Sequence, residues 1–121
     1  MISAHFARSE SACKCGCGFA TVDVESITVL EDLRHFFDRP VNIQSGCRCP
    51  VYNLRINGAK KSYHLVGQAH DITITQCPPD MVARYLDKKY PDKYGIGNYL
   101  NFTHIDVRPI KARWQGHNYN V

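Results

Sequence analysis

Two residues that could bind a metal ion lie seven positions apart in the segment Ser-Tyr-His-Leu-Val-Gly-Gln-Ala-His-Asp, residues 62–71. His64 offers an imidazole nitrogen and Asp71 a carboxylate oxygen, and zinc binds both kinds of atom at about 2.0–2.2 Å. Gly67 lies between them and permits the tight backbone path that would let the two side chains converge. His70 would face the opposite side of a strand from Asp71, so we do not expect it to be a ligand.

A third ligand is expected from the segment Thr-His-Ile-Asp-Val-Arg, residues 103–108. A catalytic zinc ion keeps three protein ligands and leaves a fourth position open for water. Side chains at positions i and i+2 of a strand share a face, so His104 and Asp106 would both face the site. Each residue alone could be an ordinary surface, capping or ion-paired side chain, but the combination favours a metal site. The predicted ligands are His64, Asp71 and His104.

The elements that must position these segments follow from hydrophobic spacing and turn residues. We expect helices over Val24 to Phe37, after Pro50, and from Pro78 to about Lys89, the last with Met81, Val82, Tyr85 and Leu86 facing the core. We expect strands at 41–45, 69–75, 94–99 and 102–108, and no regular structure through residue 18. This order predicts an α+β fold, with a small antiparallel sheet and helices packed on one face, in a single domain over residues 1–121.

The composition is typical of a globular protein, with 44% apolar and 21% charged residues. No segment reaches the roughly 20 apolar residues of a membrane-spanning helix, and the first residues do not resemble a signal peptide. We therefore expect synthesis in the cytoplasm. The net charge of +4 favours either anionic partners or only solubility. Because the basic residues are scattered and no nucleic-acid motif accompanies them, we expect no nucleic-acid partner, and we expect a monomer.

Six cysteines are many for 121 residues. Five of them form two clusters, Cys13/Cys15/Cys17 and Cys47/Cys49, while Cys77 stands apart. The clusters could bind a structural zinc ion, form disulfides that tether the N-terminal segment, or remain buried thiols. The spacing lacks the familiar Cys-x-x-Cys form, and the sequence does not choose among these states.

The pattern Ser-x-His-x-x-Gly-x-Ala-x-Asp at residues 62–71, followed by His-x-Asp at 104–106, resembles the zinc D-alanyl-D-alanine carboxypeptidase family, peptidase family M15. This family includes L-alanyl-D-glutamate endopeptidases of phage endolysins and shares its fold with the hedgehog signalling domain. Residues 45–53 are similar to the family segment Ser-Gly-(x)-Arg-x-Pro-x-x-Asn. The resemblance extends from about Phe6 to Trp114.

The resemblance implies that His64, Asp71 and His104 bind Zn²⁺. It also implies that Arg48 points at the scissile carbonyl, where a fixed cation binds substrate and stabilises the oxyanion formed during hydrolysis. Ser62 could bind substrate, orient His64, or serve only as a turn or cap residue.

The sequence departs from the family at one position that matters. Many members place Glu or Asp three residues before the last zinc histidine as general base, but this chain has Asn101 there. An amide cannot accept a proton at neutral pH, so the base must lie elsewhere. Asp106 could be that base, or it could be the hydrogen-bond partner of a ligand.

These observations predict a zinc metallopeptidase that hydrolyses stem peptides of bacterial peptidoglycan, as a D-Ala-D-Ala carboxypeptidase or an endolysin-type endopeptidase. A compact chain of this kind suits a phage lysin that acts on the cell wall after release, or a phage structural component. The alternative is a non-catalytic zinc-binding domain on the same scaffold, which Asn101 keeps open. A basic wall-binding or nucleic-acid-binding module without metal is disfavoured because it leaves the His, Asp and His pattern unexplained.

Overall fold

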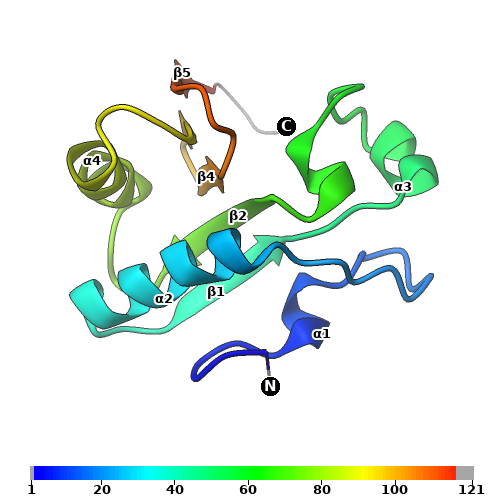
Figure 1. Cartoon of the computed structure of the whole chain (residues 1–121), viewed down its shortest axis with the longest axis horizontal. Coiled ribbons are helices and arrows are strands. Elements are labelled where there is room, and N and C mark those ends of the chain that lie inside the picture. The colour runs from blue at the N-terminus through cyan, green and yellow to red at the C-terminus, as the bar shows by residue number, and fades with distance from the viewer. Residues whose placement is uncertain (1, 117–121) are drawn as a thin grey trace.

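Helices separate the first three strands along the chain, the last three strands follow one another directly, and all five form one sheet in the order β1-β2-β4-β3-β5 (Figure 1). The computed structural model describes residues 2–116. The strands are β1 (Val41–Ser45), β2 (Ala69–Ile74), β3 (Gly95–Asn98), β4 (Thr103–Asp106) and β5 (Ala112–Gln115). The helices are α1 (Arg8–Ser11), α2 (Val24–Phe37), α3 (Pro50–Arg55) and α4 (Pro79–Lys89), with a 3₁₀ helix, η1 (Tyr63–Val66).

The predicted α+β class is confirmed, but the sheet is not wholly antiparallel. The pairs β1–β2, β2–β4 and β3–β4 are antiparallel, whereas β3 and β5 are parallel. The chain reverses direction after β3 and again after β4, so β5 returns in the direction of β3 and pairs with its other edge. No strand was expected in this tail, and the expectation of no regular structure through residue 18 is wrong for the single turn of helix α1.

Helix α2 begins where the sequence predicts, because Asp23 accepts a hydrogen bond from the backbone amide of Glu25 at 2.8 Å. The apolar residues Val24, Ile27, Leu30, Leu33, Phe36 and Phe37 recur at helical spacing, which predicts that they face the core, and Ile27, Leu30 and Leu33 are buried as predicted. The prediction is wrong for Val24 and Phe36, which are 80% and 58% exposed. Val24 is the first residue of the helix, and Phe36 stacks on Tyr85 of α4 at a centroid distance of 4.0 Å.

Helix α4 turns a slightly different face to the core than the sequence predicts. Val82 and Leu86 are buried four positions apart, and Tyr85 packs partly buried against the same cluster. Met81 is 52% exposed, so its assignment to the core is wrong. Ala83 takes the buried position instead, since successive helical residues are rotated by about 100° and only one stripe of α4 faces the sheet.

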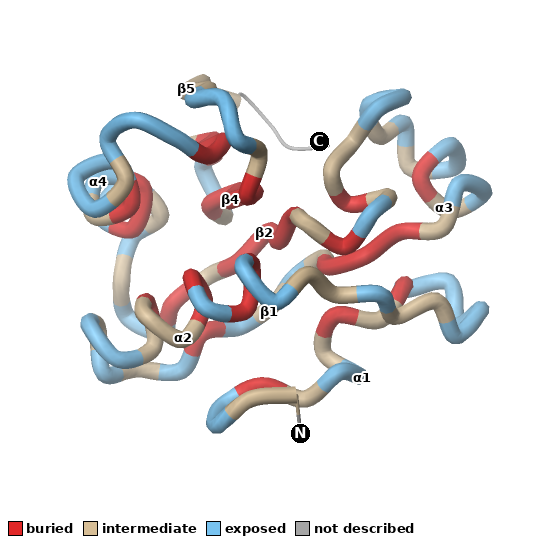
Figure 2. The backbone as a smooth tube through the Cα atoms, in the orientation of Figure 1, coloured by how far each residue is buried: buried red, intermediate tan, exposed pale blue. Residues whose placement is uncertain are grey.

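The sheet separates the hydrophobic core from the predicted metal ligands. Ile72 of β2 and Ile105 of β4 belong to the buried cluster that includes side chains of α2 and α4, so the two long helices pack on one face as predicted. Alternation along each strand then turns Asp71 and His104 to the other face. Both strands are buried along this central part of the sheet (Figure 2). Among residues 2–116, no helix has both the length and the apolar character needed to cross a membrane.

Candidate metal centre

The three predicted ligands converge at the centre of the sheet. Asp71 of β2 and His104 of β4 are direct neighbours in the antiparallel register, and His64 reaches them from η1. One potential ligand atom from each residue lies within 4.8 Å of the others. All three side chains are buried, with residue exposures of 0% for His64 and 4% for Asp71 and His104.

The distances within this group suit one metal ion. The carboxylate of Asp71 lies between the two rings, with Oδ2 3.3 Å from His64 Nε2 and Oδ1 2.9 Å from His104 Nδ1. Donor atoms at 2.0–2.2 Å from a tetrahedral zinc ion lie about 3.4 Å from one another. Burial alone would raise the pKa of Asp71, but the neighbouring His64 and the hydrogen bond with His104 hold it well below its usual range. Asp71 is therefore an anionic donor at neutral pH.

The ring of His64 is oriented for metal binding by the backbone. Its Nδ1 donates a hydrogen bond to the carbonyl of Gly46 at 2.6 Å, so the hydrogen sits on Nδ1 and the lone pair on Nε2. Burial lowers the pKa of His64, which favours this neutral ring. Nε2 is the one buried side-chain polar atom in the described part of the chain that has no hydrogen-bond partner. Such an atom needs an explanation, and a metal ion between His64 and Asp71 provides one.

Local backbone geometry places η1 against β2. Gly67 ends η1 with φ +71°, and its carbonyl accepts a hydrogen bond from the amide of Asp23 at 2.9 Å. A Cβ atom at this position would collide with the carbonyl of Thr21, which confirms that the tight path needs glycine. Ser62 starts η1, where its hydroxyl accepts a hydrogen bond from the amide of His64 at 3.1 Å. Ser62 thus acts as a cap, and substrate contact remains a prediction.

His104 is held between two carboxylates. Its Nδ1 faces Asp71, and its Nε2 lies 2.8 Å from Oδ2 of Asp106. Burial alone would lower the pKa of His104, but the hydrogen bonds with Asp106 and Asp71 raise it above its usual value. A carboxylate on the far nitrogen is the usual partner of a metal-binding histidine, because it fixes the ring and makes the ligand more basic.

Asp106 is engaged on both oxygens. It is fully buried, and the guanidinium of Arg108 donates to Oδ1 at 2.7 Å and to Oδ2 at 2.6 Å. Burial alone would raise the pKa of Asp106, but the hydrogen bonds from Arg108 and His104 hold it well below its usual range. A carboxylate of this kind is a weak proton acceptor. Of the two roles considered for Asp106, the geometry favours orientation of His104 over general-base catalysis.

Arg48 lies beside the predicted ligands and is only 2% exposed. Its guanidinium donates to Asp71 Oδ2, Ser45 Oγ and Asn53 Oδ1, each at 3.2 Å. Ser45 and Asn53 were not assigned a role from the sequence. Ser45 and Asn53 are the first and last residues of the segment 45–53 that resembles the family, and this position could have identified them as partners of Arg48.

A pocket of about 380 Å³ opens beside this centre. His104 and Ser62 line it together with Lys61, and the guanidinium of Arg108 lies over the rings of Tyr63 and Trp114 at 4.5 Å and 5.2 Å. Neither aromatic residue was predicted to lie beside the site, since Trp114 belongs to strand β5, which was not expected, and Tyr63 has no distinctive spacing.

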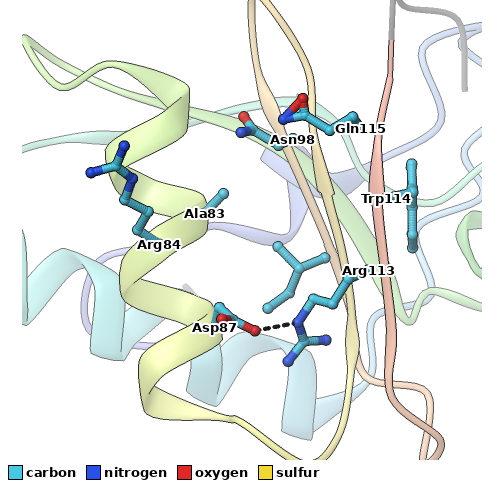
Figure 3. A pocket seen from close by; sticks show the side chains of 8 residues that line it. Ala83, Arg84, Asp87, Asn98, Arg113, Trp114 and Gln115 are labelled. Atoms are coloured by element: carbon cyan, nitrogen blue, oxygen red, sulfur yellow. Dashed lines mark hydrogen bonds and ion pairs between the residues drawn. The ribbon is translucent and has the colours of Figure 1, made fainter.

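A second pocket, of about 500 Å³, lies between α4 and the strands β3 and β5 (Figure 3). An ion pair of 2.6 Å between Asp87 and Arg113 closes one side of it. None of the three predicted metal ligands lines this pocket, so it is separate from the candidate centre.

Asn101 and His70 lie outside the metal group. Asn101 is exposed in the turn between β3 and β4. His70 is 1% exposed and lies between two hydroxyls, with Nε2 3.0 Å from Ser11 Oγ and Nδ1 2.9 Å from Ser26 Oγ. Burial lowers the pKa of His70 to about 3. His70 therefore joins α1 and α2 to the sheet as a neutral, hydrogen-bonded residue.

A His70→Leu variant tests this structural role. Leucine keeps most of the buried volume but leaves the hydroxyls of Ser11 and Ser26 without this partner, which costs about 1–3 kcal/mol for an unsatisfied buried group. We expect a lower free energy of unfolding by denaturant titration, with unchanged metal content. Loss of metal from a folded His70→Leu protein would contradict the assignment.

A comparison with known protein families matches the part of the chain that carries this centre. The family model Peptidase M15 matches residues 4–106, which is most of the chain. The chain belongs to the peptidase M15 family. The matched range contains all three predicted ligands as well as Arg48 and Asp106, and the resemblance seen in the sequence is confirmed. No curated protein matches the chain. Peptidases of the M15 family are typically zinc-dependent, and in this member the His64, Asp71 and His104 group could hold a metal ion.

Proposed function

We propose that this M15 peptidase is a zinc enzyme that hydrolyses peptide bonds in the stem peptides of bacterial peptidoglycan. The observation that carries the proposal is the buried Nε2 of His64, which has no hydrogen-bond partner and faces Asp71 and His104 beside an open pocket. One imidazole, one carboxylate and a second imidazole are a donor set typical of catalytic zinc. When bound, zinc supplies a Lewis acid and lowers the pKa of water toward about 7.

The residues around the ligands have distinct proposed roles. Arg48 is a rigidly held cation beside Asp71 and would stabilise the oxyanion that forms as the scissile carbonyl is attacked. Asp106 would hold the ring of His104 in the orientation needed for binding. Ser62 would contact substrate at the pocket wall that it lines.

The pocket chemistry supports a peptide that carries carboxylates. Lys61 lines it, and its positive charge suits a carboxylate group of a peptidoglycan stem peptide, whereas the charge of Arg108, which also lines it, is paired with Asp106. Tyr63 and Trp114 offer aromatic surface next to them. We also propose that residues 1–121 act as one zinc peptidase domain and as a monomer, in the hedgehog/DD-peptidase arrangement that the resemblance implies.

The proposal is tested by incubating the metal-loaded protein with purified peptidoglycan, with and without a chelator. Release of soluble fragments is followed by mass spectrometry. We expect chelator-sensitive hydrolysis that zinc restores. Free D-alanine as product would identify a carboxypeptidase, and a new amino terminus within the stem peptide would identify an endopeptidase. Absence of hydrolysis in a protein that contains one zinc ion at the His64 centre would contradict the enzymatic proposal.

That last result would support the second candidate, a zinc-binding domain without catalysis. The exposed Asn101 favours this candidate, since it stands where many relatives carry the general base. An Asn101→Asp variant separates the two. If it gains hydrolysis that the original chain lacks, the scaffold is competent and only the base is missing.

An Asp106→Asn variant distinguishes the two roles of Asp106. If Asp106 orients His104, zinc affinity should fall by roughly 10–100-fold, and excess zinc should restore much of the hydrolysis rate. Metal titration and rate measurements at rising zinc concentration would show this. If the variant instead keeps its zinc and loses about 10²–10⁴ in rate, Asp106 is the general base.

A further inference from the structure

Four cysteines converge at a place separate from the His64 centre. Cys13, Cys15 and Cys17 lie in the loop between α1 and α2, and Cys49 immediately precedes α3. Their sulfur atoms all lie within 4.8 Å of one another. Cys47 does not belong to this group, since its thiol donates to the carbonyl of Phe19 at 3.0 Å.

The sulfur distances match a tetrahedral metal site. Cys13 Sγ is 3.5 Å from Cys15 Sγ and 3.8 Å from Cys49 Sγ, and the Cys15 and Cys49 sulfurs are 3.7 Å apart. Four sulfurs at about 2.3 Å from a central zinc ion are separated by about 3.8 Å. A disulfide would draw one pair together, whereas three nearly equal separations are expected when the sulfurs surround a common centre.

The backbone around the cysteines supports thiolate ligands. Amide groups point at three of the sulfurs: Phe19 N at Cys17 Sγ (3.5 Å), Cys49 N at Cys13 Sγ (3.4 Å) and Tyr52 N at Cys49 Sγ (3.4 Å). Such N–H donors favour the negative charge of a thiolate. Gly16 and Gly18 have φ values of +83° and +91°, which lets the loop turn around the sulfurs.

We propose that Cys13, Cys15, Cys17 and Cys49 form a second, structural metal site that binds zinc. Four thiolates with no open position are the donor set of a structural zinc ion, in contrast to the three-ligand centre at His64. On binding, the thiols lose their protons to solvent and no oxidant is needed. Cys15 and Cys17 are exposed, so the ion can enter from solvent.

This site would fix the loop that carries Arg48. Cys49 directly follows Arg48 in the chain, and the metal would join Cys49 to the N-terminal loop that contains Cys13. A cross-link between positions 36 residues apart removes chain entropy from the unfolded state. The amide of Arg48 also donates to the carbonyl of His64 at 2.9 Å, so the metal would hold Arg48 between two anchored segments.

Zinc content by elemental analysis, after purification with reductant, tests the proposal independently of activity. We expect two zinc ions per wild-type chain. A His64→Ala/His104→Ala protein should keep one ion, held by the cysteines. A Cys15→Ser/Cys17→Ser protein should also keep one, held at His64. Because both serine replacements are at exposed positions, they remove ligands without creating a core cavity. Cys77→Ser, a cysteine outside the group, is the matched control and should keep both ions.

Cobalt(II) substitution reports the ligands directly in the wild-type chain. A tetrathiolate site gives intense sulfur-to-cobalt charge-transfer absorption, and we expect this signal in the His64→Ala/His104→Ala protein and its loss in Cys15→Ser/Cys17→Ser.

A wild-type chain with one zinc ion that only the histidine variant loses would overturn the cysteine site and leave the proposed peptidase centre intact. The cysteine site would also be overturned, in favour of disulfides, if the chain were isolated without metal and its intact mass were lower than that of the reduced chain by two hydrogens per cysteine pair. If the wild-type chain held one zinc ion and only the Cys15→Ser/Cys17→Ser variant lost it, the cysteine site would be upheld and the proposed zinc peptidase centre would fail.

Discussion

Replacing His104 by alanine should abolish peptide hydrolysis and weaken zinc binding. The variant removes one of three nitrogen and oxygen donors and leaves Asp71 and Asp106 facing each other without the ring that now separates them. Two ligands cannot hold the ion in the geometry that water activation requires. His64→Ala should have the same effect, because its buried Nε2 has no hydrogen-bond partner and lies 3.3 Å from Asp71 Oδ2, where the ion would bind. Zinc titration and peptidoglycan hydrolysis measure the two losses.

The control for this prediction is His35→Ala. His35 is exposed in the last turn of α2, far along the chain from the ligands, and its removal should change neither metal content nor rate. Circular dichroism of each variant would establish that it is folded. Full zinc occupancy at this centre together with normal turnover in His104→Ala would remove His104 from the site.

Arg48→Lys should lose about 10²–10³ in rate, the usual cost of removing one oxyanion stabiliser, while it keeps zinc and fold. Lysine preserves the charge, but its ammonium group cannot reproduce the planar fork that donates at once to Ser45, Asn53 and Asp71. The rate constant at saturating substrate and the zinc affinity should be measured on the same preparation.

The structure adds a second outcome to this test. Because Arg48 donates to Asp71, it could act by holding that ligand rather than by contacting substrate. Zinc affinity would then fall together with the rate, and excess zinc would recover activity. The exposed Arg55 of α3 provides the matched control, since Arg55→Lys makes the same chemical change outside the centre. Wild-type turnover in Arg48→Lys would exclude both roles.

The sequence predicted most elements because their signals are local. Asp23 caps α2, Pro79 starts α4, and the alternation in β2 and β4 follows from strand geometry alone. The same local rules placed Asp71 and His104 on one face. The error at Met81 has a physical reason, since apolar spacing shows that a helix has a buried stripe but not which edge of that stripe the neighbouring elements cover.

Tertiary structure alone decided which residues surround the ligands. The pairing of β5 with β3, which brings Trp114 near His104, joins distant segments and has no local signal. Arg108 lies only two residues from Asp106, so their ion pair is local, but the packing of its guanidinium over the rings of Tyr63 and Trp114 joins distant segments.

The cysteines show the same division. Their types and spacing indicated metal or disulfide chemistry, but only the approach of α3 to the N-terminal loop brings Cys49 to Cys13 and leaves Cys47 aside. The sequence therefore determined the types of the candidate ligands and, for Asp71 and His104, the strands that carry them. The fold decided which donors meet, because convergence depends on contacts between residues far apart along the chain.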